Sequence, residues 1–178
     1  SSAVIRSPAR RPAAAAAVYR QILELDPESV PTLKKLAAAA SNLGAWPEVA
    51  VVAERLVAIG TTPAERHEWR ATLAQVFAER LNKKDEAARL YLGLVSEGVA
   101  TAPVIGGLER LAAQGVRQSE FSRTLAPLYW QSGDHQRQVA SLLVQLASAQ
   151  AVDEQKRLLT LLAQTSEQHL LDERAALD

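Results

Sequence analysis

Between Pro31 and Ile59, apolar residues recur every three or four positions in two segments separated by Leu43-Gly44-Ala45-Trp46-Pro47. This spacing places the apolar residues of each segment on one face of a helix. Gly44 can adopt the left-handed conformation that ends a helix, and Pro47 suits the first turn of the next. The stretch therefore predicts an antiparallel helical hairpin. Its contact face consists of Leu33, Leu36, Ala37, Ala40 and Leu43 in the first helix and of Val49, Val52, Ala53 and Leu56 in the second.

The same spacing continues along the chain, and no strand-like alternation is sustained, so we expect an all-α fold of nine or ten helices. The first helix is predicted from Ala13 to Leu25, where Asp26-Pro27-Glu28-Ser29 ends it. Further along, Thr62-Pro63-Ala64-Glu65 predicts a capping box, in which Thr62 caps a helix and Glu65 reaches back to the cap.

Each of the other helices is expected to turn its apolar positions toward a core. These positions are Tyr19, Ile22 and Leu23; Trp69, Leu73, Ala74, Phe77 and Leu81; Ala87, Leu90, Tyr91 and Leu94; Ile105, Leu108 and Leu111; Phe121, Leu125, Leu128 and Tyr129; Val139, Leu142, Leu143 and Leu146; and Leu158, Leu159, Leu162 and Ala163. The positions for which burial is predicted most firmly are Leu36, Ala37, Leu73, Ala74, Leu125 and Leu162.

Parts of this pattern repeat along the chain. The segment from Tyr19 to Leu36 recurs 72 residues later, from Tyr91 to Leu108, which is about two periods of 34 residues. The segment from Leu73 to Ala87 recurs 89 residues later, from Leu162 to Ala176. A helical hairpin repeated in this way predicts a solenoid, because one hairpin cannot bury its own apolar face.

The hairpin resembles a tetratricopeptide repeat (TPR) in its residues Leu33, Leu36, Ala37, Ala40, Gly44, Trp46, Val49, Ala53 and Leu56. Weaker versions of the motif include Leu73, Ala74, Phe77, Ala87, Tyr91 and Leu94; Leu125, Ala126, Tyr129, Gly133 and Asp134; and Leu162 and Ala163. The chain is thus similar to divergent bacterial tandem-repeat proteins of this family. The resemblance implies a right-handed α-α superhelix, a TPR-like solenoid of antiparallel helical hairpins over residues 13–178, as an excerpt from a longer array.

One helix departs from the TPR pattern. The helix that contains Ile105 and Leu108 resembles the first helix of a repeat, and so does the helix that follows it. The alternation therefore has one helix too many, and the residues that line the concave surface after Gly115 cannot be assigned from the sequence.

Composition narrows the classes of function. Lysine plus arginine and aspartate plus glutamate both number 20, so no net field draws the chain to nucleic acid or to an acidic membrane. Cysteine is absent, which excludes disulfides and thiolate chemistry and leaves the compartment open. No apolar run approaches the roughly 20 residues that span a bilayer, so no membrane insertion is expected. Methionine is also absent, so we do not expect Ser1 to be a native start.

Residues 1–12 form a basic arm that contains Arg6, Arg10 and Arg11. Two interpretations are open: a flexible end, or an arm that lies against an acidic surface of this chain or of a neighbour. The body of the chain is neutral and poor in aromatic residues, so the arm alone does not predict nucleic-acid binding.

No catalytic or metal-binding motif is complete. His67-Glu68 begins like a zinc-protease helix, but the position four residues after His67 is Ala71. His135 and His169 stand isolated in the sequence, and Gly106-Gly107 is not followed by the lysine and hydroxyl residue of a phosphate loop. We therefore expect no catalysis, no metal and no cofactor.

The TPR resemblance implies a protein–protein interaction module that binds a peptide or a partner protein in its concave groove. The residues that the resemblance places in this groove are Lys34, Ala38, Ser41 and Asn42 in the first repeat and Glu68, Ala71, Gln75 and Glu79 in the second. This set is of both signs and lacks the dense lysine, arginine and asparagine of the family's carboxylate clamp, so a receptor for acidic chaperone tails is not expected.

Trp130 has two interpretations. At about 100° per residue it points nearly opposite to Phe121, away from the face that its own hairpin would bury. Either an additional helix covers Trp130 as part of the core, or Trp130 is a surface aromatic beside Arg123 and Gln131. Tryptophan and arginine are enriched in binding hot spots.

The alternative function is a structural scaffold or spacer that assembles end to end. Residues 172–178 predict the beginning of a tenth helix, which would offer Ala175, Ala176 and Leu177 to another repeat or subunit. Self-assembly through this helix or through the basic arm is therefore a second expectation.

Overall fold

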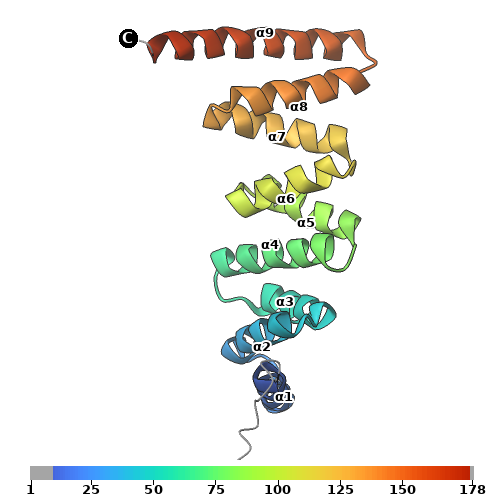
Figure 1. Ribbon diagram of the computed structural model, residues 1–178, viewed down its shortest axis with the longest axis vertical. Helices are drawn as coiled ribbons and strands as arrows, with labels where there is room; N and C mark the ends of the chain where they lie inside the picture. Colours follow the sequence, from blue (N-terminus) through green and yellow to red (C-terminus); the bar gives the residue numbers. More distant parts are fainter. Residues whose placement is uncertain (1–9, 177–178) are drawn as a thin grey trace, which may run out of the picture. The chain divides into compact units, whose positions relative to one another are not determined.

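The computed structural model of the chain describes residues 10–176. Within this range the chain forms nine α-helices and no strand, which confirms the all-α prediction (Figure 1). The helices are α1 (Arg10–Leu25), α2 (Val30–Leu43), α3 (Trp46–Ile59), α4 (Pro63–Glu79), α5 (Lys84–Ser96), α6 (Ala102–Ala113), α7 (Gln118–Ser132), α8 (His135–Ser148) and α9 (Val152–Ala175).

Two compact units divide the chain. The first unit, Ser1–Val99, contains α1 to α5, and the second unit, Ala100–Asp178, contains α6 to α9. Within each unit, consecutive helices pack against one another. Contacts between neighbours in sequence therefore build both units.

The hairpin predicted around Gly44 is formed by α2 and α3. Gly44 has a φ of +69°, and its N–H donates to the carbonyl oxygen of Ser41 at 3.1 Å. Pro47 lies in the first turn of α3. The apolar cluster on which this part of the first unit is built contains Ala16, Leu23, Leu33, Leu36, Ala37, Ala39, Val52 and Leu56, with Tyr19, Leu43 and Trp69 packed against it.

Half of the predicted capping box forms at the start of α4. The Thr62 hydroxyl oxygen accepts the N–H of Glu65 at 3.2 Å. The Glu65 carboxylate does not reach back to the cap, because Lys34 of α2 donates to it at 2.7 Å and the Thr61 hydroxyl donates to it at 2.5 Å. A hydrogen bond between charged groups is stronger than one to a neutral N–H, which explains the difference.

The prediction of a tenth helix is wrong. α9 continues without a break from Val152 to Ala175, so Asp172 lies inside it. No glycine or proline interrupts these 24 residues, and most of them favour helix. The end of the chain after Ala176 lies outside the described residues.

Five of the six residues predicted to be buried are buried, namely Leu36, Ala37, Leu73, Ala74 and Leu125. Leu162 is only partly buried, against a cluster of Ala126, Leu142 and Leu158. Ala163 is exposed in the same helix.

The predicted inward positions Ile22 and Leu159 are also exposed, at 39% and 54%. Both lie beside a buried leucine, Leu23 or Leu158. The helices α1 and α9 pack mainly against a single neighbour each, α2 and α8. One neighbour covers a narrow stripe, so apolar residues at its edge stay in contact with solvent.

On α8 the covered face differs from the apolar face. Leu143 is 51% exposed, whereas Gln138, Ser141 and Gln145 are buried together with Leu142. Because α7 and α9 both pack against α8, the buried face is the one that these two helices share. That face carries polar side chains in this sequence, and it positions the site described next.

Candidate binding site

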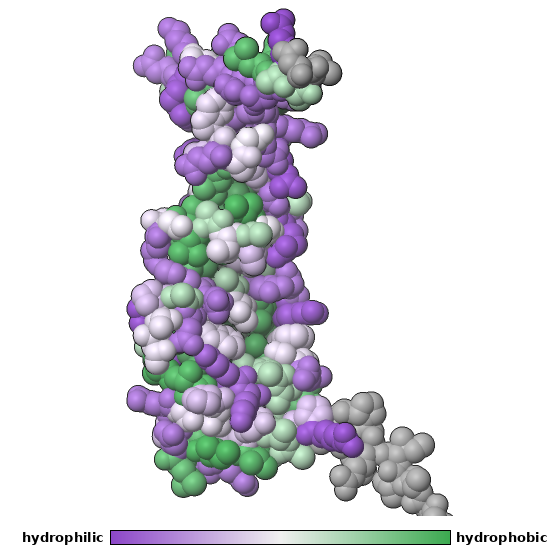
Figure 2. Space-filling model, turned by 90° about the vertical axis from the view of Figure 1, so that its left-hand side faces the viewer, coloured by the Kyte–Doolittle hydropathy of each residue, from purple (hydrophilic) through white to green (hydrophobic). Residues whose placement is uncertain are grey.

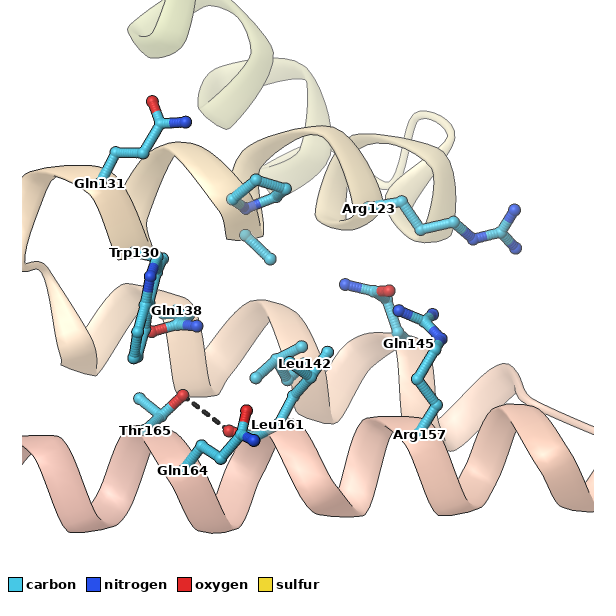
Figure 3. Close-up of a pocket in the computed structure, with 12 residues that line it drawn as sticks. Arg123, Trp130, Gln131, Gln138, Leu142, Gln145, Arg157, Leu161, Gln164 and Thr165 are labelled. Atoms are coloured by element: carbon cyan, nitrogen blue, oxygen red, sulfur yellow. Dashed lines mark hydrogen bonds between the residues drawn. The ribbon is translucent and has the colours of Figure 1, made fainter.

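A cavity of about 370 Å³ lies between α7, α8 and α9 in the second unit. Each helix lines it with residues at positions i, i+4 and i+7, which share one helical face. These residues are Arg123, Pro127 and Trp130 from α7; Gln138, Leu142 and Gln145 from α8; and Arg157, Leu161 and Gln164 from α9. Three parallel stripes of this kind make an elongated site (Figure 3).

The floor of the cavity is apolar and belongs to the core. Ala126 and Leu142 are buried and pack with Leu158. Thr165 also lines the cavity, but its hydroxyl donates to the carbonyl oxygen of Leu161 at 2.8 Å. The floor therefore offers packing surface and no free hydroxyl group.

Two glutamines of α8 frame the floor, and they differ in their hydrogen bonds. The Gln145 amide donates to the carbonyl oxygen of Ser122 on α7 at 3.1 Å, which fixes this side chain. Gln138 is only 5% exposed, and its Oε1 has no hydrogen-bond partner among the described residues. A buried acceptor without a donor costs about 1–3 kcal/mol, so a donor brought by a ligand would remove this cost.

The charged residues that line the cavity are all positive. Arg123 and Arg157 line the cavity, and none of its 12 lining residues is acidic. Among the described residues, neither arginine forms an ion pair. The lining therefore carries two positive charges that no other lining residue neutralises.

Trp130 forms one wall of the cavity and is 45% exposed. An additional helix therefore does not cover it, as the core interpretation requires, and it is exposed as the surface interpretation expects. Arg123 and Gln131, which the surface interpretation placed beside it, line the same cavity. The structure brings these three predicted residues together, and their role in binding stays a prediction.

His135 and His169 lie next to Trp130, an arrangement that the sequence did not predict. The rings of Trp130 and His135 meet edge to face at 6.3 Å between centroids, and the His135 and His169 rings are 5.6 Å apart. His135 Nε2 lies 2.8 Å from a carboxylate oxygen of Asp172, whose pKa is lowered by this hydrogen bond and by one from Gln168. The interpretation of His135 and His169 as isolated is therefore wrong.

On a second face of α7 and α8, charged side chains are paired with each other. The Tyr129 hydroxyl donates to Glu109 at 2.6 Å, and Arg137 donates to the same carboxylate at 3.2 Å. Burial, together with the hydrogen bond to Glu109, raises the pKa of Tyr129. Arginine and carboxylate are matched on this face, unlike in the cavity.

The groove residues that the TPR resemblance placed in the first unit have partners of their own. Lys34 binds Glu65, the Ser41 hydroxyl donates to the carbonyl oxygen of Ala37 at 2.8 Å, and the Gln75 amide donates to Glu79 at 3.2 Å. Asn42 is exposed at the end of α2. The structure does not gather these residues into the cavity, and their role in binding is also untested.

The basic arm is only partly described. Arg6 lies outside the described residues, as does the side chain of Arg10. Arg10 begins α1, and Arg11 follows it as an exposed residue, so the helix starts three residues before the predicted Ala13. The contacts expected of this arm stay a prediction.

Sequence reasoning missed Gln138, Gln145 and Arg157. The signal that could have found them is the repeated spacing Gln138–Leu142–Gln145 and Arg157–Leu161–Gln164 on consecutive helices. Each triplet places one leucine between two polar residues on a single helical face. This pattern is typical of a helical face that is only partly buried.

Residues 10–176 offer neither a metal site nor a membrane-spanning helix. No group of three or more histidine, cysteine, aspartate or glutamate side chains there is arranged to hold a metal ion. Among the described helices, none combines the length and the apolar character needed to cross a membrane.

Comparison with known proteins adds no relative. No family model, no curated protein and no solved structure matches this chain. The function must therefore be argued from the site itself.

Proposed function

We propose that this chain is a protein–protein interaction module that binds a segment of a partner protein in the cavity between α7, α8 and α9, without catalysis. The observation that carries the proposal is Gln138 Oε1, a buried acceptor without a partner beside an apolar floor and a half-exposed tryptophan. Binding cavities typically combine an apolar surface with a few converging polar groups. Tryptophan at such a place is typical of a binding hot spot.

The chemistry of the lining favours binding over catalysis. The described lining residues include no carboxylate, histidine or cysteine, so they supply neither a general acid or base nor a thiolate. The one hydroxyl group, that of Thr165, is buried and bonded to its own helix. Amides, arginines and an indole ring recognise a ligand without transforming it.

The proposal keeps the TPR-like solenoid as its architecture. The support for it is local: consecutive helices pack against one another in each unit, and α2 and α3 form the hairpin in which the motif is strongest. In such an array the second unit presents three consecutive helices to a partner, and the cavity lies among them.

A peptide selection tests the proposed function. A random peptide library displayed on phage is selected on the immobilised chain, and the enriched peptides are measured against two variants. Gln164→Trp places an indole at the mouth of the cavity, because Gln164 is exposed and lines it. Gln75→Trp makes the same change at an exposed position of α4 in the first unit.

We expect Gln164→Trp to lower the affinity of the enriched peptides by at least roughly tenfold and Gln75→Trp to leave it unchanged. If only Gln75→Trp weakened binding, the site would lie in the first unit. If no peptide bound the chain, the proposed function would be wrong.

A second candidate function is self-assembly through α9. Val152, Leu159 and Leu170 are exposed on this helix, and Ala163 lies between the last two. Their spacing of seven, four and seven residues is that of a coiled-coil seam. Hydrophobic surface is also visible near the C-terminal end of the helix, where Leu170 and Leu171 are both 59% exposed (Figure 2, top).

Sedimentation velocity tests this candidate. If α9 mediates assembly, the chain sediments as an oligomer, and Leu159→Glu combined with Leu170→Glu converts it to a monomer. A wild-type chain that stays monomeric at all concentrations tested would exclude the scaffold.

A further inference from the structure

We propose that the segment bound in the cavity is an extended peptide that places a carboxylate side chain at Arg123 and Arg157 and a large apolar side chain on Trp130. This inference rests on the proposed function and adds the chemistry of the partner. It is carried by the juxtaposition of two unpaired arginines with an apolar floor and an indole wall in one cavity.

Arg123 and Arg157 bring positive charge to the cavity. Bringing two arginines to one cavity without a carboxylate leaves like charges that repel each other. On the opposite face of α7 and α8, Arg137 is paired with Glu109 at 3.2 Å and with Asp134 at 3.5 Å. The same unit thus pairs an arginine where it is part of the fold and leaves Arg123 and Arg157 unpaired where they line the cavity.

A carboxylate is the ligand group that fits two arginines. The guanidinium group presents its N–H donors in a planar fork that matches a carboxylate, and such hydrogen bonds are about twice as strong as neutral ones. The neighbouring Gln145 donates its amide N–H to the Ser122 carbonyl oxygen at 3.1 Å, and its amide oxygen is neutral, so this side chain does not neutralise the two positive charges. An acidic side chain of a partner is therefore the group that we expect these arginines to bind.

The charged and the aromatic side chains lie at different ends of the cavity (Figure 3). Arg157 and Arg123 lie toward one end, with Gln145, whereas Trp130, Gln138 and Thr165 lie toward the other, and Leu142 and Leu161 lie between (Figure 3). The bound segment must therefore present its acid and its large apolar group at opposite ends, with contact to leucine between them.

The helical geometry gives the separation of the two groups. Arg123 and Trp130 are seven residues apart on α7, which corresponds to roughly 10 Å along a helix axis. An extended peptide in the polyproline II conformation advances about 3.1 Å per residue with three residues per turn, so residues three positions apart cover this distance and share one face. The expected motif therefore has an acidic residue three positions from a leucine, phenylalanine or similar residue.

The amide side chains of the cavity suit the backbone of a bound segment. An extended peptide carries N–H and C=O groups that must find partners when they leave water. Gln138 Oε1 is covered in this structure and can accept one of these N–H groups after its side chain rotates toward the cavity that it lines, and the amides of Gln131 and Gln164 lie at the same cavity. Side-chain amides can form hydrogen bonds with the backbone of any peptide. The preference for particular peptide sequences is therefore set by the arginines and Trp130.

The test uses the peptides selected on the full chain. We expect the enriched sequences to contain aspartate or glutamate three positions from a large apolar residue. Changing that acid to its amide should lower the affinity for the wild-type chain at least roughly tenfold. Binding should also weaken as the salt concentration rises.

Two variants locate the effect at the cavity. Arg123→Gln combined with Arg157→Gln should bind the acidic peptide and its amide form equally. Lys156→Gln is the matched control for a lost positive charge, because Lys156 is exposed beside Arg157 and does not line the cavity. This control should keep the full preference for the acid.

The outcomes separate the inference from the proposed function. Two results would overturn the inference and leave the proposed function standing. In the first, the peptides lose binding in Gln164→Trp but carry no acid. In the second, the double arginine variant recognises the acid of the peptides as well as the wild-type chain does. The absence of any bound peptide would overturn both the inference and the proposed function. A self-associated chain that the double arginine variant converts to monomers would identify a second copy as the occupant and overturn the inference.

Discussion

The two units of this chain treat their polar groups differently. In the first unit, charged side chains on different helices are matched: Arg20 with Glu48 and Lys34 with Glu65 at 2.7 Å each, and Arg70 with Glu97 at 2.7 Å. In the second unit, α8 buries glutamines, one of them with an unpartnered oxygen, and two arginines line a cavity without a carboxylate.

We propose that this difference separates interactions that complete a fold from interactions that await a partner. The ion pairs of the first unit are partly exposed and contribute little stability individually, but they leave no strong demand for an external group. The cavity of the second unit has such demands, namely a donor for Gln138 Oε1 and an anion for its arginines. We therefore propose that the first unit supplies architecture and the second unit recognition.

The largest expected effect on this comparison is the loss of stability when a core side chain of the first unit is truncated. Leu33 is fully buried in the cluster that joins α1, α2 and α3. We expect Leu33→Ala to lower the free energy of unfolding by about 2–5 kcal/mol through the cavity that it leaves. Urea denaturation measures the loss, and peptide binding by the fraction that stays folded should be unchanged. A loss below about 1 kcal/mol would show that the α1–α3 cluster is not a tightly packed core.

A pair of glutamine substitutions tests the second unit with opposite signs. Gln138→Met replaces a buried acceptor without a partner by an apolar side chain of similar length, so we expect about 1 kcal/mol of added stability. Gln145→Met removes a side chain that donates to Ser122, so we expect a loss of about 1 kcal/mol. Thermal unfolding of both variants checks the signs.

The same pair should separate stability from binding. Gln138→Met is expected to weaken the selected peptides although it stabilises the fold, because the acceptor for the peptide N–H is lost. If Gln138→Met destabilised the chain as much as Gln145→Met, Gln138 would already be satisfied in the folded protein, and the assignment of an unmet acceptor would be wrong.

The structure also shows how much of the fold could be predicted from the sequence. The hairpin of α2 and α3 could be predicted because Gly44 and Pro47 give local conformational signals. Periodicity also located the apolar face of most helices. It could not tell which neighbour covers that face, and so Leu143 and Leu159 were expected inside while Gln138 and Gln145 were not.

The candidate site was predictable in part. Trp130 and Arg123 stood out by residue type and direction on one helix, whereas Arg157 joins them from a helix more than 25 residues further along the chain. The contact of His135 with His169 was missed for the same reason, since 34 residues separate them. Convergence of this kind depends on how α7, α8 and α9 pack, which no local pattern contains.

The smallest expected effect concerns pH and the ion pairs of the first unit. Hydrogen bonds from Lys34 and then Thr61 lower the pKa of Glu65 from 4.5 to about 2. A lowered pKa in the folded state means that Glu65 contributes stability above pH 4.5 and loses this contribution as the pH falls toward 2. Glu65→Gln should therefore make the unfolding midpoint of the chain less dependent on pH within this window.

The matched comparison for this effect is Glu68→Gln, an exposed glutamate of the same helix. Its change should leave the acid limb of the pH profile as in the wild type. If the two variants showed the same profile, the pair of Lys34 and Glu65 would not link α2 to α4 in solution.

The most direct measurement of the division between the two units compares two tryptophans. Trp130 is 45% exposed at the cavity, whereas Trp69 packs against the apolar cluster of the first unit. For each Trp→Ala variant, the melting temperature and the affinity for the selected peptides are measured on the same preparation. We expect Trp130→Ala to change the melting temperature by no more than about 4 °C and to weaken binding by about 2 kcal/mol or more. Trp69→Ala should lower the melting temperature further and leave binding by the folded protein intact. The reverse result, binding lost with Trp69 and kept without Trp130, would contradict the assignment of recognition to the second unit.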